Sequence, residues 1–176
     1  MKISVIYSSQ SGNTELIARA IQKELTESHQ VKLEKIDEIK SDFLNDYNLL
    51  FVGSPIHAGG LSAPVKKFLN ALPENARFKI AGFITHASSA FNAEGYESGI
   101  YQLEKAAKNK NISFLGYFHC QGRLAPELHD MVRKKQNASD EEWAEKMAEC
   151  NKHPDSKDKE GAQEFARKIM SKEETP

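Results

Sequence analysis

The sequence VIYSSQSGNTELIA, residues 5–18, decides the fold of this chain. Its apolar beginning predicts a strand buried on both faces of a parallel sheet. The apolar residues that recur at helical spacing after Thr14 predict an amphipathic helix. Between the two lies a loop of small and hydroxyl residues. A strand that turns directly into a helix aims backbone N–H groups and the positive helix end at one point, which is how a chain binds phosphate.

The loop also indicates which phosphate compound would bind. It contains neither Lys nor Arg, so the Lys of a G-x-x-x-x-G-K-[ST] loop, which binds polyphosphate with Mg²⁺, is missing. We therefore expect a monophosphate held by backbone N–H groups and hydroxyl donors. The alternative is an ordinary strand-to-helix turn with Ser and Asn as cap residues. Such a cap needs one residue of this kind, whereas five of the six residues 9–14 are Ser, Thr, Asn or Gly.

Residues Val5 to Ile21 resemble the flavodoxin phosphate-loop signature along their whole length, and the core pattern S-x-S-G-N-T at residues 9–14 is specific. The resemblance implies a flavodoxin-like α/β fold and FMN as the cofactor. It places the 5′-phosphate of FMN on the following loop residues: Ser9, Gln10, Ser11, Gly12, Asn13 and Thr14.

Strand and helix patterns alternate along the rest of the chain. Further strands are predicted at 31–36, 47–53, 79–85 and 112–120, with helices at 62–72 and 97–108. Five strands separated by helices indicate βαβ units and a parallel sheet. The resemblance implies a three-layer sandwich with strand order 2-1-3-4-5 and the ligand between the first and third strands.

Two more loops follow strands at the expected ligand edge. Residues 53–62 resemble the G-S-P-I-Y-x-G-[SG] loop of flavodoxin-like reductases, with His57 in place of the aromatic residue. The resemblance implies that a backbone group of this loop bonds flavin N5, and Gly59 would permit a peptide flip there. A plain strand-to-helix connection is the alternative. The predicted flavin contacts are Ser54, Pro55, Ile56, His57, Ala58 and Gly59.

The resemblance implies that the third loop, residues 85–96, meets the pyrimidine end of the flavin through backbone N–H groups, and the expected contacts there are His86, Ala87 and Ser88. Phe91 or Tyr96 stacks on the flavin ring or, equally, plugs the loop against the protein. For His57 and His86 we expect contact or solvent-exposed roles, and we predict no catalytic residue.

Composition fits a single domain over residues 1–176, and the formal net charge of −1 gives no reason to expect nucleic acid or an anionic membrane as a partner. Met1 leads directly into the first strand, so we expect no signal peptide. Cys120 and Cys150 lie far apart, and a reduced, cytoplasmic protein is the simpler interpretation. We predict no metal site, because His119, His129 and His153 lack ligand spacing.

Residues 124–153 exceed what a minimal five-strand domain needs, and residues 155–171 predict the closing helix. The fifth strand ends at the ligand edge, so the inserted segment begins near the flavin. We expect it to form either a helical flap or partner surface over the site, or an insertion packed on the side of the sheet.

Three functions remain open from the sequence. The first is an FMN-dependent carrier that passes electrons between redox partner proteins. The second is an NAD(P)H-dependent FMN or quinone reductase, which the loop at 53–62 resembles. The third is a flavodoxin-like interaction module without a cofactor. The sequence does not decide the oligomeric state.

Overall fold

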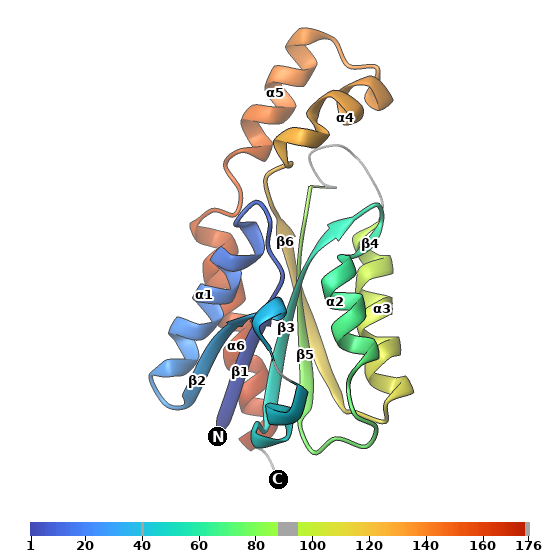
Figure 1. Cartoon of the computed structure of the whole chain (residues 1–176). Helices are drawn as coiled ribbons and strands as arrows, with labels where there is room; N and C mark the ends of the chain where they lie inside the picture. The colour runs from blue at the N-terminus through green and yellow to red at the C-terminus, as the bar shows by residue number, and fades with distance from the viewer. Residues whose placement is uncertain (40, 88–94, 175–176) are drawn as a thin grey trace.

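The computed structural model describes residues 1–39, 41–87 and 95–174, and it contains a parallel sheet covered by helices on both faces (Figure 1). The strands are β1 (Lys2–Tyr7), β2 (Gln30–Lys35), β3 (Leu49–His57), β4 (Gly60–Leu61), β5 (Lys79–His86) and β6 (Phe114–Gln121). The α-helices are α1 (Asn13–Thr26), α2 (Ala63–Asn70), α3 (Tyr96–Asn109), α4 (His129–Gln136), α5 (Asp140–Cys150) and α6 (Ser156–Glu174). Short 3₁₀ turns are η1 (Ile36–Glu38), η2 (Ser41–Asp46) and η4 (Pro126–Leu128).

The strand order is β2-β1-β3-β5-β6, with all neighbours on this path parallel. The predicted order 2-1-3-4-5 is therefore confirmed, since β5 and β6 are the fourth and fifth strands of the parallel sheet. The chain crosses from β2 past β1 to β3, which leaves the carboxyl end of β1 beside that of β3. In the β1–β3 register, Tyr7 lies opposite Gly53.

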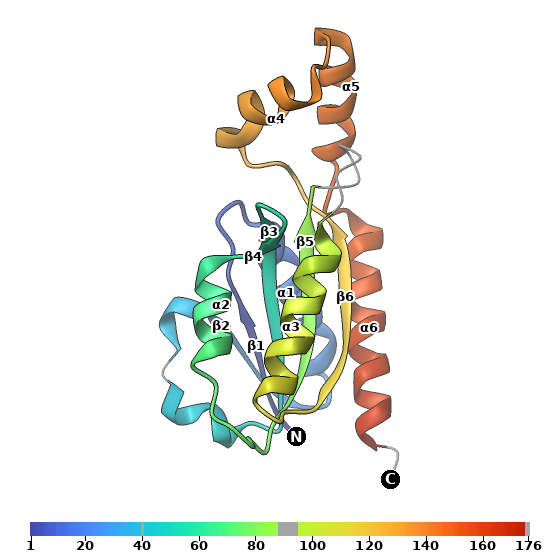
Figure 2. The same cartoon turned by 90° about the vertical axis from the view of Figure 1, so that its right-hand side faces the viewer.

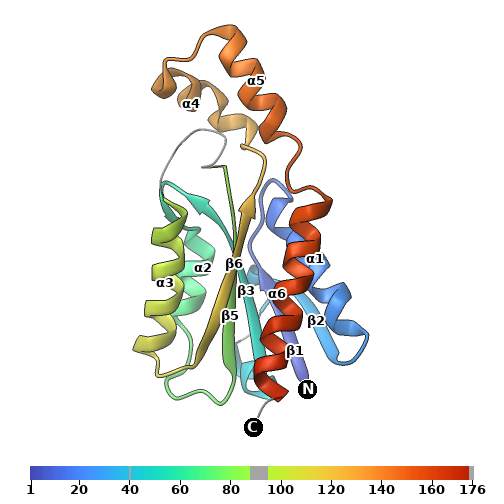
Figure 3. The ribbon, with the colours of Figure 1, turned by 180° about the vertical axis from the view of Figure 1, so that it is seen from behind.

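Alternation along the strands builds two separate cores. Ile3 and Val5 of β1 pack against α1 and α6, whereas Ile6 faces the other side, against α2 and α3. This follows from the period of two in a strand, where successive side chains point to opposite faces. Figures 1 and 3 show α1 and α6 on one face and α2 and α3 on the other. The three-layer sandwich is thus confirmed.

The third strand differs from its prediction. Residues 54–57 were expected in a loop, but β3 continues to His57 and folds back as an antiparallel hairpin with β4. Pro55 lies opposite Thr85 in the β3–β5 register, near the end of the parallel pairing. Pro55 and the glycines on both sides of this segment suggested an irregular loop, and the pairing with neighbouring strands overrides that local preference.

The predicted helical insertion is present and consists of η4, α4 and α5. Figures 1 and 2 show α4 and α5 beyond the carboxyl edge of the sheet, at the end where β6 finishes. The alternative of an insertion packed on the side of the sheet is therefore wrong. A small core of Leu124, Met147 and Cys150 has Val132 of α4 packed against it, which joins the two helices, and Ala87, directly after β5, packs against it too. A capping box at Ser139 begins α5.

Candidate functional site

The loop between β1 and α1 has the geometry of an anion site. Gly12, directly before the helix, adopts a left-handed φ of +83°, which glycine tolerates without strain. Because glycine has no side chain that could cap α1, the N–H groups of the first turn stay available to a ligand. The loop is tied to the neighbouring strand by the N–H of Ser8, which donates to the carbonyl oxygen of Gly53 at 3.1 Å.

The side chains of this loop divide into two groups. Thr14 is buried, and its hydroxyl shares a 2.8 Å hydrogen bond with that of Thr85 at the end of β5. Gln10 and Ser11 are exposed. The Oγ atom of Ser9 is buried and has no hydrogen-bond partner. Burying a hydroxyl without a partner lowers the stability of a protein by about 1–3 kcal/mol. A hydrogen bond from Ser9 to a polar ligand would remove this cost.

A residue that the sequence did not reveal lies beside the loop. The amide of Asn13 donates to the backbone oxygen of Arg123 at 2.8 Å, and Nε of Arg123 donates back to Oδ1 of Asn13 at 3.3 Å. The two residues are 110 positions apart. The loop itself contains neither Lys nor Arg, but the fold brings a guanidinium to it.

The second predicted loop is the tight turn of the β3–β4 hairpin. Ala58 and Gly59 have φ values of +47° and +78°, and two consecutive positive φ angles are typical of a two-residue hairpin turn. His57, Ala58 and Gly59 are exposed at this turn. Ser54 is fully buried instead, and its Oγ accepts from the N–H of Ser62 at 3.0 Å. Ser54 therefore holds the hairpin by its side chain.

Three aromatic rings gather at the ends of β5, β6 and α3. Tyr96 stacks on His86 with ring centroids 4.4 Å apart and on His119 at 4.2 Å. Nε2 of His86 and Nδ1 of His119 lie 3.1 Å apart, within hydrogen-bond distance. Burial, and after it the neighbouring His119, lower the pKa of His86 to about 4. Burial also lowers the pKa of His119.

These positions correct one expectation and leave others open. His86 is 4% exposed, so a solvent-exposed role for it is wrong, whereas His57 is exposed as expected. Tyr96 stacks on protein side chains, as the plug interpretation predicts. Ser88 and Phe91 lie outside the described residues. The pairing of His86 with His119 was missed, because no local spacing links two residues from different strands.

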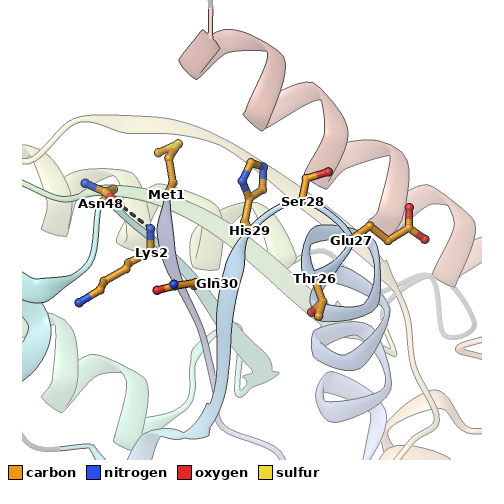
Figure 4. Close-up of a pocket in the computed structure, with 8 residues that line it drawn as sticks. All are labelled: Met1, Lys2, Thr26, Glu27, Ser28, His29, Gln30 and Asn48. Carbon is orange, nitrogen blue, oxygen red and sulfur yellow. Dashed lines mark hydrogen bonds between the residues drawn. The ribbon is translucent and has the colours of Figure 1, made fainter.

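Two further polar clusters lie in the described part of the chain, one at the opposite edge of the sheet and one at the start of α6. A cavity of about 630 Å³ at the opposite, amino-terminal edge is lined by residues from β1, the end of α1, β2 and Asn48 (Figure 4). In it, the backbone N–H of Lys2 donates to Oδ1 of Asn48 at 2.9 Å. Potential metal-ligand atoms of His153, Asp155 and Asp158 lie within 4.8 Å of one another. Those carboxylates accept hydrogen bonds from the backbone at the start of α6 and from His153, so they act as a helix cap.

The comparisons with known proteins bear on this geometry. The family model described as a flavodoxin domain matches residues 4–167. The chain belongs to the flavodoxin family. It is 29% identical to the flavodoxin-like domain-containing protein BilS of Clostridioides difficile, over 98% of both chains.

Among solved structures, oxidised flavodoxin 2 of Bacillus cereus has a TM-score of 0.70 and 21% identity, covering 98% of this chain and 99% of that one. A flavoprotein from Lactobacillus acidophilus, solved in complex with FMN, has a TM-score of 0.53 and 20% identity, covering 67% of this chain and 92% of that one. These likenesses agree with the observed fold. None of the helices in the described part of the chain combines the length and apolar character that crossing a membrane requires.

Members of the flavodoxin family typically bind FMN, and the residues at the carboxyl edge fit that cofactor. Ser9 offers a buried hydroxyl without a partner, and the N–H groups at the start of α1 face the same loop. A phosphate monoester needs donors of these kinds. The site residues are therefore compatible with FMN in the chemistry of their donors.

Proposed function

We propose that this flavodoxin-family chain binds FMN at the carboxyl edge of its sheet and carries electrons between redox partner proteins. One observation supports the site above all. Within the described residues, the buried side-chain polar atoms without a hydrogen-bond partner include Ser9 Oγ and His86 Nδ1. Ser9 follows β1 and His86 ends β5, so both lie at the same edge of the sheet. Because each such atom is costly to bury unpaired, their gathering suits a polar ligand that completes them.

Different loops contact different parts of the cofactor. In this proposal Ser9, Asn13 and the first N–H groups of α1 hold the phosphate, and the turn at Ala58 and Gly59 lies against the ring system. The whole set of proposed cofactor contacts is Ser9, Gln10, Ser11, Gly12, Asn13, Thr14, Ser54, Pro55, Ile56, His57, Ala58, Gly59, His86, Ala87, Ser88, Phe91 and Tyr96. The bound flavin supplies the reversible uptake of electrons, and the protein supplies position and shielding from water.

A carrier fits the described side chains better than an enzyme with its own acid, base or nucleophile. Burial raises the pKa of both thiols, Cys120 and Cys150, which keeps them protonated at neutral pH and therefore weak nucleophiles. The lowered pKa values of His86 and His119 keep that pair neutral. Free, buried thiols also suit a reducing compartment, so we place the protein in the cytoplasm. In this proposal residues 1–176 act as one functional domain.

Titration of the apoprotein with FMN, followed by absorbance and fluorescence, tests the site. We expect Ser9→Ala to weaken FMN binding about tenfold without lowering the stability of the apoprotein, since it removes an unsatisfied hydroxyl. Ser28→Ala, at the amino-terminal cavity, is the matched control and should change neither property. A wild-type protein that stays colourless and takes up no FMN would support a cofactor-free module and overturn the proposal.

Anaerobic reduction separates the carrier from the reductase. We expect NADPH alone to leave the flavin absorbance of the reconstituted protein almost unchanged, and NADPH with catalytic amounts of a separate flavoprotein reductase to bleach it. Rapid bleaching by NADPH alone would establish the alternative, an NAD(P)H-dependent reductase.

A further inference from the structure

Arg123 joins the phosphate loop to the inserted helices. It follows the end of β6 by two residues and begins the connection to η4 and α4. Its reciprocal hydrogen bonds with Asn13, described above, fix its backbone against the first residue of α1. The preceding residue, Gly122, shows how close this approach is, because a Cβ there would lie 2.9 Å from Nδ2 of Asn13. The segment therefore packs directly on the loop that the phosphate would occupy.

The charge of Arg123 is not balanced by a carboxylate in the part of the chain that the structure describes. Its side chain is exposed, and among these residues its guanidinium bonds only through Nε, to Asn13. Among residues 1–39, 41–87 and 95–174, no carboxylate forms an ion pair with it. Glu15, the acidic residue in the first turn of α1, is paired with Arg19 at 2.7 Å. Arg123 thus brings a positive charge, with terminal N–H groups that no described residue binds, to a loop that has no cation of its own.

We propose that Arg123 recognises the dianionic phosphate of the flavin and makes the site select FMN over unphosphorylated riboflavin. The inference rests on the proposed function, since it concerns the same site. A guanidinium presents N–H groups in a planar fork that matches phosphate oxygens and stays charged at all relevant pH values. Hydrogen bonds to a charged group are stronger than neutral ones, and the bond to Asn13 holds Nε of the guanidinium beside the first residue of α1.

The test measures the affinity of the apoprotein for FMN and riboflavin at low and high salt. We expect Arg123→Met to weaken FMN binding about tenfold, to leave riboflavin binding unchanged, and to flatten the salt dependence of FMN binding. Arg123→Lys keeps the charge and should retain the salt dependence with an intermediate affinity. Lys135→Gln removes the same charge from exposed α4 and should behave as wild type.

A second measurement does not depend on a flavin. Inorganic phosphate alone should raise the melting temperature of wild-type apoprotein and of Lys135→Gln, and have a smaller effect on Arg123→Met. Equal losses of FMN and riboflavin affinity in Arg123→Met, or an unchanged FMN affinity, would overturn the inference while the proposed function stands. Failure of the wild type to bind either flavin would overturn the proposed function, and the phosphate experiment would still decide whether Arg123 recognises phosphate.

Discussion

The buried histidine at the end of β5 makes a sharp prediction about acid stability. The pKa of His86 falls from 6.5 to about 4 in the folded protein, chiefly through burial. Between about pH 6.5 and pH 4 the imidazole of His86 is protonated in the unfolded chain and neutral in the folded one. The free energy of unfolding therefore decreases as pH falls through this range. One pKa unit corresponds to about 1.4 kcal/mol. From this residue alone we expect a loss of about 2 kcal/mol between pH 7 and pH 5.

Urea unfolding of the apoprotein at a series of pH values measures this loss. The variant His86→Gln cannot titrate, so its unfolding free energy should fall less between pH 7 and pH 5, by about 2 kcal/mol. Nuclear magnetic resonance of the His86 ring gives the pKa directly and remains informative if the variant is unstable. Equal acid losses in both proteins, or a midpoint for His86 above pH 6, would refute the reasoning.

His153 serves as a control of opposite sign. A 2.6 Å hydrogen bond to Asp158 is the main cause that raises the pKa of His153. Its contribution is fully present below the unfolded pKa and disappears as pH rises through the folded pKa. Relative to His153→Gln, the wild type should therefore become more stable as pH falls from 8 to 6. His86, in contrast, lowers the free energy of unfolding as pH falls from about 6.5 towards 4.

Three further predictions concern the scaffold of the site. Thr14→Val should destabilise the protein by about 1–3 kcal/mol, because it leaves the buried hydroxyl of Thr85 without its partner. The double variant with Thr85→Val should recover part of that loss in a double-mutant cycle, and strict additivity would contradict the buried pair. Gly53→Ala would place a Cβ 2.2 Å from the ring of Phe83, so urea unfolding should show a loss of about 1–3 kcal/mol, and an unchanged midpoint would show that the ring moves freely. Ser139→Ala should cost α5 about 1 kcal/mol by removing its N-terminal cap, seen as faster amide hydrogen exchange in that helix alone.

Local sequence was a good guide wherever one element follows another directly. The strand, loop and helix of residues 5–18 could be predicted because apolar periodicity and a glycine with positive φ act over a few residues. The order of the strands followed from the family resemblance and from the rules for βαβ connections. The segment at 54–57 was misjudged, because its glycine-rich and proline-containing neighbourhood suggested a loop while strand pairing extended β3.

The sequence by itself determined the alternation of strands and helices and the absence of Lys and Arg from the loop at residues 9–14. Only the tertiary structure decided which distant groups stand beside that loop. Asn13 meets Arg123 across 110 positions, and His86, Tyr96 and His119 come together from three elements. The physical reason is that periodicity and turn chemistry act between near neighbours, whereas hydrogen bonds and ring stacking between elements depend on the register and packing of the assembled sheet.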